Sequence, residues 1–537
     1  MTVQTLASTP VAPSLGPRQG LLLRGWRSAE RAIDRVCGES DNPLRQLGAL
    51  GFLMFWLVAA TGVYLYVFFD TSLAGAYASV ERLTHAQWWA GGVMRSLHRY
   101  ASDAMVVLLV LHLVRELALG RFSGFRWFSW VSGVPTPWLL VASGVTGYWL
   151  VWDEVAQFVV IAMTEWFGVL PGFGPQLVRN FVGENAVTDR MFSLVAFLHI
   201  GLPLALLLAM WMHIQRLTRP RTMPSPAVTL WSIAALLLLS LLLPAQSLPP
   251  ADLLRVPALL PIDWFYLAVF PAIYEGSSVA VWAALAGVTL ALLATPWAVR
   301  RERPAPVIVD PANCNGCTRC FADCPYEAIE MLPHPSGRGQ IARVDEDRCA
   351  SCGICAGACP SSTPFRSGQR LATGIDLPSL RIDALRARLV AQIDSARAGG
   401  AGAPVVVFGC AAGAPIQQLP GVLGFDLVCA AMLPPAFVDY ALRAGAAGVV
   451  VSSCSPEDCE FRFGARWLAE RLAGQREPGL RDAVDRDRVR LVLAAREEAG
   501  ELAAQVERFR GELARRRTGV SVPAARPARH DSGRARG

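Results

Sequence analysis

The feature that most constrains this chain is the placement of four of its seven histidines inside very apolar stretches. His98 and His112 form one pair, His199 and His213 form another, and both pairs have a spacing of fourteen residues. In an α-helix the second histidine then falls about 40° from the first and about 21 Å further along the axis. Two such helices side by side would present facing histidines at two depths of a membrane, as a protein with two stacked haems requires. A lone intramembrane histidine is often a satisfied polar core residue, but ionisable groups in lipid are costly and usually functional, so the repeated spacing favours haem ligation.

Six apolar segments before residue 300 are long enough to cross a bilayer, which takes about 20 helical residues. They are Leu47–Phe69, Gly92–Val114, Phe128–Trp152, Arg190–Gln215, Ala227–Leu243 and Ser277–Val299, of which the fifth is marginal. A shorter run, Val155–Leu170, contains Glu165 and is interpreted as an interfacial helix in a loop. The chain is 53% hydrophobic, too apolar for an ordinary soluble protein, and its charged residues concentrate after residue 300.

Arginines gather in alternate loops, which predicts the orientation because cytoplasmic loops carry excess positive charge. They are Arg18, Arg24, Arg27, Arg31, Arg35 and Arg45 before the first span, Arg115, Arg121 and Arg126 after the second, Arg216, Arg219 and Arg221 after the fourth, and Arg300, Arg301 and Arg303 after the sixth. Both termini are therefore expected in the cytoplasm, with the second and fourth spans parallel. This pairs His98 with His199 near the outer face and His112 with His213 near the inner face. If Val155–Leu170 also spanned, the pairing would cross.

Two arginines and four glycines accompany the histidines. Arg95 and Arg99 break the charge rule at the outer end of the second span, and we interpret them either as snorkelling to head groups or as partners of haem propionates. Glycines recur at the histidine interval as Gly48 and Gly62 in the first span and as Gly133 and Gly147 in the third. Because glycine lets a backbone approach closely, we expect these four to pack against a flat macrocycle, although glycines are common in membrane helices.

Residues 96–105 (SLHRYASDAM), residues 144–153 (GVTGYWLVWD) and the pair His199 and His213 resemble cytochrome b of the quinol-oxidising respiratory and photosynthetic complexes. The photosynthetic form is the closer, and the resemblance covers about residues 40–300. It implies that the four histidines are the axial ligands of two b haems, and it allows a homodimer through this region. The photosynthetic form has a cysteine that holds an extra haem covalently, where this chain has Gln46, so that haem is not predicted.

The loop before the sixth span reads Pro261-Ile-Asp-Trp-Phe-Tyr-Leu267, which is similar to the motif at the family's outer quinol-oxidation site. The resemblance implies that Pro261, Asp263 and Trp264 belong to a quinone site. Asp263 stands where the family has a glutamate that accepts a quinol proton, and a carboxylate there is chemically sensible because quinol oxidation releases protons that need a base. The alternative is an amphipathic loop with an interfacial aromatic belt.

Eight of the thirteen cysteines form two copies of the pattern C-x2-C-x2-C-x3-C-P between residues 305 and 365. This spacing predicts two [4Fe–4S] clusters, in which the fourth cysteine of each run ligates the other cluster. One cluster would then use Cys314, Cys317, Cys320 and Cys359, and the other would use Cys349, Cys352, Cys355 and Cys324. Zinc is the alternative that this doubled pattern disfavours. The segment resembles bacterial two-cluster ferredoxins, which implies an α+β fold.

After a helical linker at 366–402, residues 403–515 alternate between strand and helix patterns, which predicts a small parallel α/β domain. The expected strands are Val405–Phe408, Asp426–Ala430, Gly448–Ser452 and Arg488–Ala494, and the expected helices are 376–397, Pro435–Ala444, Phe461–Leu472 and Glu497–Leu513. Cys410, Cys429, Cys454 and Cys459 fall at strand ends, which converge on one crevice in such sheets. Four thiols there would hold a [2Fe–2S] cluster or zinc, or would remain free.

The runs at 405–410 (VVVFGC), 447–454 (AGVVVSSC) and 457–459 (EDC) resemble the iron-sulfur (delta) subunit of methyl-viologen-reducing hydrogenase. This resemblance implies a [2Fe–2S] cluster and a cytoplasmic partner that is a flavoprotein or dehydrogenase, of the heterodisulfide-reductase type. The chain departs from that family at Gly413, where a second cysteine is usual, and at Glu460, where a histidine is usual. The remaining thiol, Cys37, is interpreted as structural or inert.

The order of these segments predicts a multidomain chain. An N-terminal cytoplasmic lead and amphipathic segment (1–44) precedes an all-α, six-helix, transmembrane di-haem cytochrome b bundle (45–300). The ferredoxin-like domain, the linker, the small parallel α/β iron-sulfur domain and a disordered basic tail (516–537) follow. We expect a multi-pass protein of the cytoplasmic (inner) membrane, with its iron-sulfur domains in the cytoplasm, that transfers electrons between a soluble redox enzyme and quinone. A structural anchor and a redox sensor are the alternatives. No aromatic-basic module indicates a nucleic-acid partner.

Overall fold

The computed structural model describes residues 17–172, 188–257, 259–299, 304–337, 339–365, 372–400 and 402–517. The chain divides into two compact units, one of which holds Leu15–Arg303 while the other holds the chain from Pro304 onward. The predictions for the lead before residue 17 and for the tail after residue 517 lie outside the described residues.

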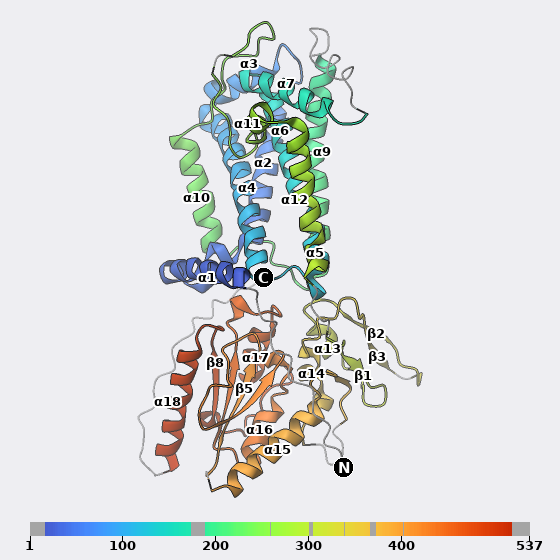
Figure 1. Cartoon of the computed structure of the whole chain (residues 1–537), viewed down its shortest axis with the longest axis vertical. Helices are drawn as coiled ribbons and strands as arrows, with labels where there is room; N and C mark the ends of the chain where they lie inside the picture. The colour runs from blue at the N-terminus through green and yellow to red at the C-terminus, as the bar shows by residue number, and fades with distance from the viewer. Residues whose placement is uncertain are drawn as a thin grey trace. The chain divides into compact units, whose positions relative to one another are not determined.

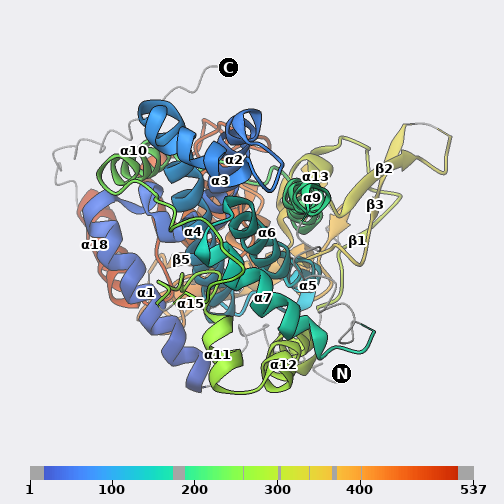
Figure 2. The ribbon, with the colours of Figure 1, turned by 90° about the horizontal axis from the view of Figure 1, so that it is seen from above.

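Long apolar helices that run along a common direction form the first unit (Figure 1). Its main helices are α2 (Leu47–Phe68), α4 (Val93–Ala118), α6 (Thr136–Val151), α9 (Asp189–Ile214), α10 (Pro226–Leu242) and α12 (Ser278–Ala298). The closest packing is of α2 on α4 and of α6 on α9. Seen along the bundle, α10 and α12 lie at separate edges of this group (Figure 2).

Shorter helices gather at the two ends of the bundle. At one end lie α3 (Ala76–Glu81), α7 (Glu154–Gly168) and α11 (Val269–Glu275), and at the other α1 (Pro17–Cys37) runs across the bundle direction (Figure 1). Glu30 of α1 is fully buried and accepts a hydrogen bond from Arg115 of α4 at 3.0 Å, which ties this amphipathic helix to the bundle.

Three of the described helices, α2, α9 and α12, are long and apolar enough by composition to cross a membrane, and α10 is a shorter apolar helix. The predicted third span is divided in the structure into α5 (Trp127–Gly133) and then α6. Pro135 and Pro137 lie at the break, where proline cannot donate a backbone hydrogen bond. The run at 155–170 forms the fifteen-residue α7, about 22 Å long by helical rise and shorter than the roughly 30 Å hydrocarbon core.

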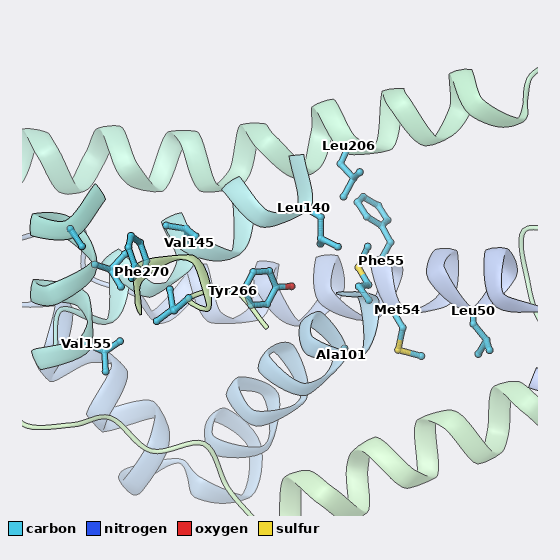
Figure 3. Packing of buried hydrophobic residues seen from close by; sticks show 14 of the residues in the cluster. Leu50, Met54, Phe55, Ala101, Leu140, Val145, Val155, Leu206, Tyr266 and Phe270 are labelled. Atoms are coloured by element: carbon cyan, nitrogen blue, oxygen red, sulfur yellow. The ribbon is translucent and has the colours of Figure 1, made fainter. Parts of the chain in front are cut away.

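A large apolar core joins the bundle helices to the loop before α11. Met54 and Phe55 of α2, Ala101 of α4 and Leu206 of α9 pack in one buried cluster (Figure 3). Tyr266, from the Pro261–Leu267 motif, lies in the same cluster and is 3% exposed. The motif therefore packs against α4 and α6 and is part of the bundle core.

The second unit begins with the ferredoxin-like segment. Its strands pair antiparallel as β1 (Ile308–Val309) with β4 (Ile375–Asp376) and as β2 (Ile329–Pro333) with β3 (Gln340–Val344). Two short helices follow cysteines, α13 (Arg319–Ala322) and α14 (Ile354–Ala358). The predicted α+β character is therefore present.

The remainder of this unit is a four-stranded parallel sheet in the order β6–β5–β7–β8. The strands are β5 (Val405–Cys410), β6 (Val422–Leu427), β7 (Gly448–Ser453) and β8 (Val489–Leu493), and the helices are α15 (Ile382–Ala398), α16 (Ala436–Arg443), α17 (Gly464–Leu472) and α18 (Ala499–Arg517). Phe509 and Leu513 of α18 pack against Val407 and Val450 of the sheet.

Three predicted boundaries in this domain are wrong. The second strand occupies Val422–Leu427 and not Asp426–Ala430, because its residues pair in parallel register with all six residues of β5. A short 3-10 helix, η7 (Ala430–Met432), follows it. The linker helix begins at Ile382 because Ile375–Asp376 pairs with β1, and α17 begins at Gly464 and not at Phe461.

Candidate cofactor sites

The four bundle histidines lie in two facing pairs. The ring centroids of His98 and His199 are 6.2 Å apart, and those of His112 and His213 are 6.4 Å apart. A metal ion that binds one nitrogen of each ring at about 2 Å fits between imidazoles at this separation, because each ring centre lies behind its nitrogen. The structure therefore brings together the pairs that the parallel helices predict, and it does not produce the crossed pairing.

Backbone carbonyls hold two of these rings in a defined orientation. The Nδ1 atom of His98 lies 3.0 Å from the Val58 oxygen, and that of His199 lies 2.9 Å from the Ser143 oxygen. Since a carbonyl oxygen only accepts, Nδ1 carries the hydrogen and Nε2 keeps its lone pair, the form of histidine that binds a metal. Thr61 and Thr146 add hydroxyl contacts to the same nitrogens at 3.1 and 3.3 Å.

Each of the four repeated glycines lies against one histidine ring. A Cβ atom at Gly62 would lie 3.1 Å from His98 Cε1, one at Gly48 3.7 Å from His112, one at Gly133 3.1 Å from His213 and one at Gly147 2.9 Å from His199. The group that these glycines allow to approach closely is therefore a histidine imidazole in each case. Their role toward a macrocycle stays a prediction.

A charged cluster surrounds Asp263 at the end of the bundle. Its side chain is 7% exposed, pairs with Arg99 at 3.0 Å and accepts a hydrogen bond from the Tyr148 hydroxyl at 2.5 Å. Arg99 also pairs with Asp103 at 3.0 Å, so two carboxylates share one guanidinium. Asp103 and Tyr148 were not among the predicted site residues. Asp103 lies four residues after Arg99, and this spacing of opposite charges on a helix could have predicted the pair from the sequence.

The other residues predicted for this region have different surroundings. Arg95 donates to Thr84 and Ser247 and lies 3.6 Å from Glu81. Trp264 is 71% exposed, as an aromatic side chain at a membrane surface would be. Both arginines thus have protein partners, and their contact with propionates stays a prediction.

The ferredoxin cysteines separate into two groups. Burial, together with the neighbouring Cys317, Cys359 and Cys314, raises the pKa of Cys320 to about 12. In the second group, burial and the neighbouring Cys352, Cys324 and Cys349, followed by Cys320 of the first group, raise the pKa of Cys355 well above its usual value. The larger contributions come from members of the crosswise sets expected from the spacing, and the ligand sets themselves stay a prediction. Crowded buried thiols resist ionisation, and bound iron offsets that cost because it favours thiolates.

The backbone around the two groups repeats. Left-handed φ values occur at Gly316 (66°) and Thr318 (62°) in the first copy and at Ser351 (52°) and Gly353 (73°) in the second. These are the second and fourth positions after Cys314 and Cys349. A left-handed conformation is costly for threonine and serine, so its recurrence marks a turn that the site requires. Cys324, Cys349, Cys352 and Cys355 also line one cavity, and the backbone amides of Ala328 and Ser351 donate to Cys324 and Cys349 sulfurs at 3.3 and 3.4 Å.

The last four cysteines meet at the carboxyl edge of the parallel sheet. Cys410 ends β5, Cys429 and Cys454 follow β6 and β7, Cys459 follows a short turn, and all four are buried. Hydrogen bonds from Cys429 and Cys454 lower the pKa of the Cys410 thiol well below its usual value. The amide of Ala465 donates to Cys459 at 3.4 Å. Cys37, by contrast, is exposed and donates to the Ile33 oxygen.

Within the described ranges, no group of three or more His, Cys, Asp or Glu side chains is arranged to hold a single metal ion. Structural zinc needs four donors around one ion. A [4Fe–4S] cluster spreads its four cysteines more widely because each sulfur binds a different iron, whereas a [2Fe–2S] cluster takes two cysteines on each iron, and a haem needs only the two axial residues. The ferredoxin groups therefore fit [4Fe–4S] clusters and the histidine pairs fit haems, while zinc stays an alternative for the last four cysteines.

A helical membrane bundle with facing histidines, joined to cysteine-rich redox domains, defines a membrane electron-transfer protein. Family models match in the same order as the domains: Cytochrome b/b6/petB over residues 38–220, the 4Fe-4S dicluster domain over 313–363, and the delta subunit of methyl-viologen-reducing hydrogenase over 406–515. These matches confirm the three resemblances found in the sequence.

Cytochrome b6 from Chlamydomonas reinhardtii is 35% identical over 172 residues, which are 31% of this chain and 78% of that protein. Cytochrome b6 from Porphyra purpurea is 34% identical over 173 residues, with the same shares. The chain therefore belongs to the cytochrome b/b6 family through its N-terminal region. Among solved structures, a hyperthermophilic respiratory Complex III matches with a TM-score of 0.40 and 20% identity, covering 50% of this chain and 81% of that one.

Proposed function

We propose that this protein is the membrane subunit that links a cytoplasmic redox enzyme to the quinone pool through one [2Fe–2S] cluster, two [4Fe–4S] clusters and two b haems. The observation that carries the proposal is the grouping of its chemistry-bearing residues. Four histidines form two facing pairs, and twelve of thirteen cysteines fall in three groups. A structural anchor would not need every such group on one chain.

The bundle residues would hold the haems as follows. His98 and His199 would ligate one, and His112 and His213 the other, with Nδ1 hydrogen bonds fixing the orientation of each ring that has one. Each haem supplies one-electron redox chemistry when bound. The Arg-rich loops support an inner-membrane orientation in which His112 and His213 lie nearer the cytoplasm. The bundle would cross the membrane six times.

The Asp263 cluster is the proposed quinone site. A quinol hydroxyl that loses its electrons must also lose its proton, and Asp263 would accept it. Tyr148 and Arg99, which already contact Asp263, would orient the carboxylate. Electrons would run toward quinone, or from quinol toward the clusters when driven by the membrane potential or by bifurcation at the partner.

The C-terminal domain is the proposed docking site for a soluble flavoprotein or dehydrogenase of the heterodisulfide-reductase type. Its match to a hydrogenase delta subunit supports this assignment. The chain contains no Rieske or C-x-x-C-H motif, so a complete quinol-to-cytochrome c cycle would need other subunits.

The test uses the full chain in liposomes. Reduced methyl viologen, added outside, serves as the electron donor, and decylubiquinone in the bilayer serves as the acceptor. The proposal predicts rapid haem reduction followed by quinol formation. Haems that stay oxidised would favour a structural anchor. Haem reduction without quinol formation, together with donor-dependent partner binding, would favour a redox sensor.

A further inference from the structure

One ferredoxin group and the four-cysteine group share a buried boundary. A Cβ atom at Gly464 would lie 2.6 Å from Cys429 Sγ and 3.5 Å from Ile354 Cδ1. Ile354 is fully buried and lies between Cys352 and Cys355 in the chain. Gly464, at the start of α17, therefore lies against both the four-cysteine group and the segment that carries the second ferredoxin group.

The backbones on either side of this boundary approach closely. A Cβ at Gly357 of α14 would lie 2.1 Å from the Ala431 oxygen, and one at Gly353 would lie 3.0 Å from Met432 Cβ. Ala431 and Met432 belong to η7, which follows Cys429 directly. Glycine is required at Gly357 because any side chain would collide with backbone.

A buried ion pair connects the two sides of the same boundary. Arg471 of α17 is fully buried, donates to the Ala431 oxygen at 2.8 Å and pairs with Asp323. Asp323 precedes Cys324, a member of the second group, and also pairs with Arg476 at 2.6 Å. Arg471 thus connects the residues next to Cys429 with the residue next to Cys324. A buried charge needs such partners, so the contact is held in one geometry.

We infer that the group of Cys324, Cys349, Cys352 and Cys355 is the direct electron-exchange partner of the group of Cys410, Cys429, Cys454 and Cys459. The group of Cys314, Cys317, Cys320 and Cys359 is then reached only through it. Arg471 is the positioning residue that fixes the distance between the two neighbouring sites. Each transfer moves one electron from one site to the other, with no bond made or broken. This inference rests on the proposed iron-sulfur content.

Electron paramagnetic resonance of the reduced full chain tests the order. Neighbouring paramagnetic clusters speed each other's relaxation, so the [2Fe–2S] signal should relax fast in the unaltered protein. We expect Cys352→Ala to slow that relaxation and Cys317→Ala to leave it unchanged. The reverse result would overturn the order. A protein with no [2Fe–2S] signal would instead contradict the proposed function.

The positioning role has its own test. Arg471→Met should weaken the relaxation enhancement and shift the [2Fe–2S] midpoint potential, and Arg471→Lys should restore part of both. Arg466→Ala, on the same helix but 69% exposed and paired with Glu470, is the matched control. If Arg471→Met fails to fold, Arg476→Ala leaves Arg471 paired with Asp323 while removing the outer partner of Asp323 and a partner of Glu470, and it should produce a smaller shift. Unchanged relaxation in a folded, fully loaded Arg471→Met protein would overturn the role.

Discussion

The imidazole rings of His98 and His199 face each other across the bundle with their centroids 6.2 Å apart, and each is contacted by a glycine from the helix packed beside its own. Gly62 of α2 backs His98 of α4, and Gly147 of α6 backs His199 of α9. The α2–α4 and α6–α9 contacts thus position each ring against the helix packed beside its own.

Replacing one histidine of a pair should remove one haem and spare the other. We expect His98→Leu to lose half of the bound haem, because the remaining imidazole cannot supply both axial positions. His112→Leu should lose the other half. Haem content and a redox titration of the remaining component measure the result. His85→Leu, at an exposed histidine paired with Glu81, is the control. Loss of both haems from each variant, with the bundle intact, would contradict independent sites.

The four glycines should differ in their tolerance of alanine. The added Cβ would lie 2.9 Å from a ring atom at Gly147, 3.1 Å at Gly62 and Gly133, and 3.7 Å at Gly48. Overpacking costs about 1–3 kcal/mol where neighbours cannot yield. Thermal loss of haem should therefore be most accelerated in Gly147→Ala and least in Gly48→Ala. Gly51→Ala, with nothing within 4 Å of the new atom, is the control. Equal effects at all four positions would argue against ring contact as the cause.

Asp263→Asn should slow quinone-linked electron transfer by about 10²–10⁴-fold, the usual contribution of a positioned general base. Asp263→Glu should retain part of the activity, because the carboxylate remains. Asp103→Asn should have a smaller effect, since it leaves Arg99 paired with Asp263 alone. The assay is haem reduction by decylubiquinol.

Asp252→Asn is the control for this series, because Asp252 is about half exposed and pairs with Arg255 in the loop after α10. Quinol-driven haem reduction that is as fast in Asp263→Asn as in the unaltered protein would exclude this carboxylate as the proton acceptor.

The sequence allowed the histidine and cysteine groups to be predicted because their spacing follows from local geometry. Fourteen residues return to one helix face, and the cysteine intervals match a cluster-binding turn. The Asp263–Arg99–Asp103 cluster was only partly predicted, since its members come from segments about 160 residues apart in the chain. Nothing in the sequence indicates that Arg471 is buried, because its burial depends on the pairing with Asp323, which lies 148 residues earlier in the chain. The β6 boundary was missed because Gly424 interrupts its apolar pattern.

The iron and zinc content of the protein can decide which metal the last four cysteines bind. We expect Cys454→Ser to lower the iron content by about two atoms per chain, as removal of one [2Fe–2S] cluster requires. The [4Fe–4S] signals should persist, since their cysteines lie in separate groups. Cys37→Ser, at an exposed thiol, is the control. One zinc per chain that disappears in Cys454→Ser would contradict the [2Fe–2S] assignment, and so would an iron content that Cys454→Ser leaves unchanged.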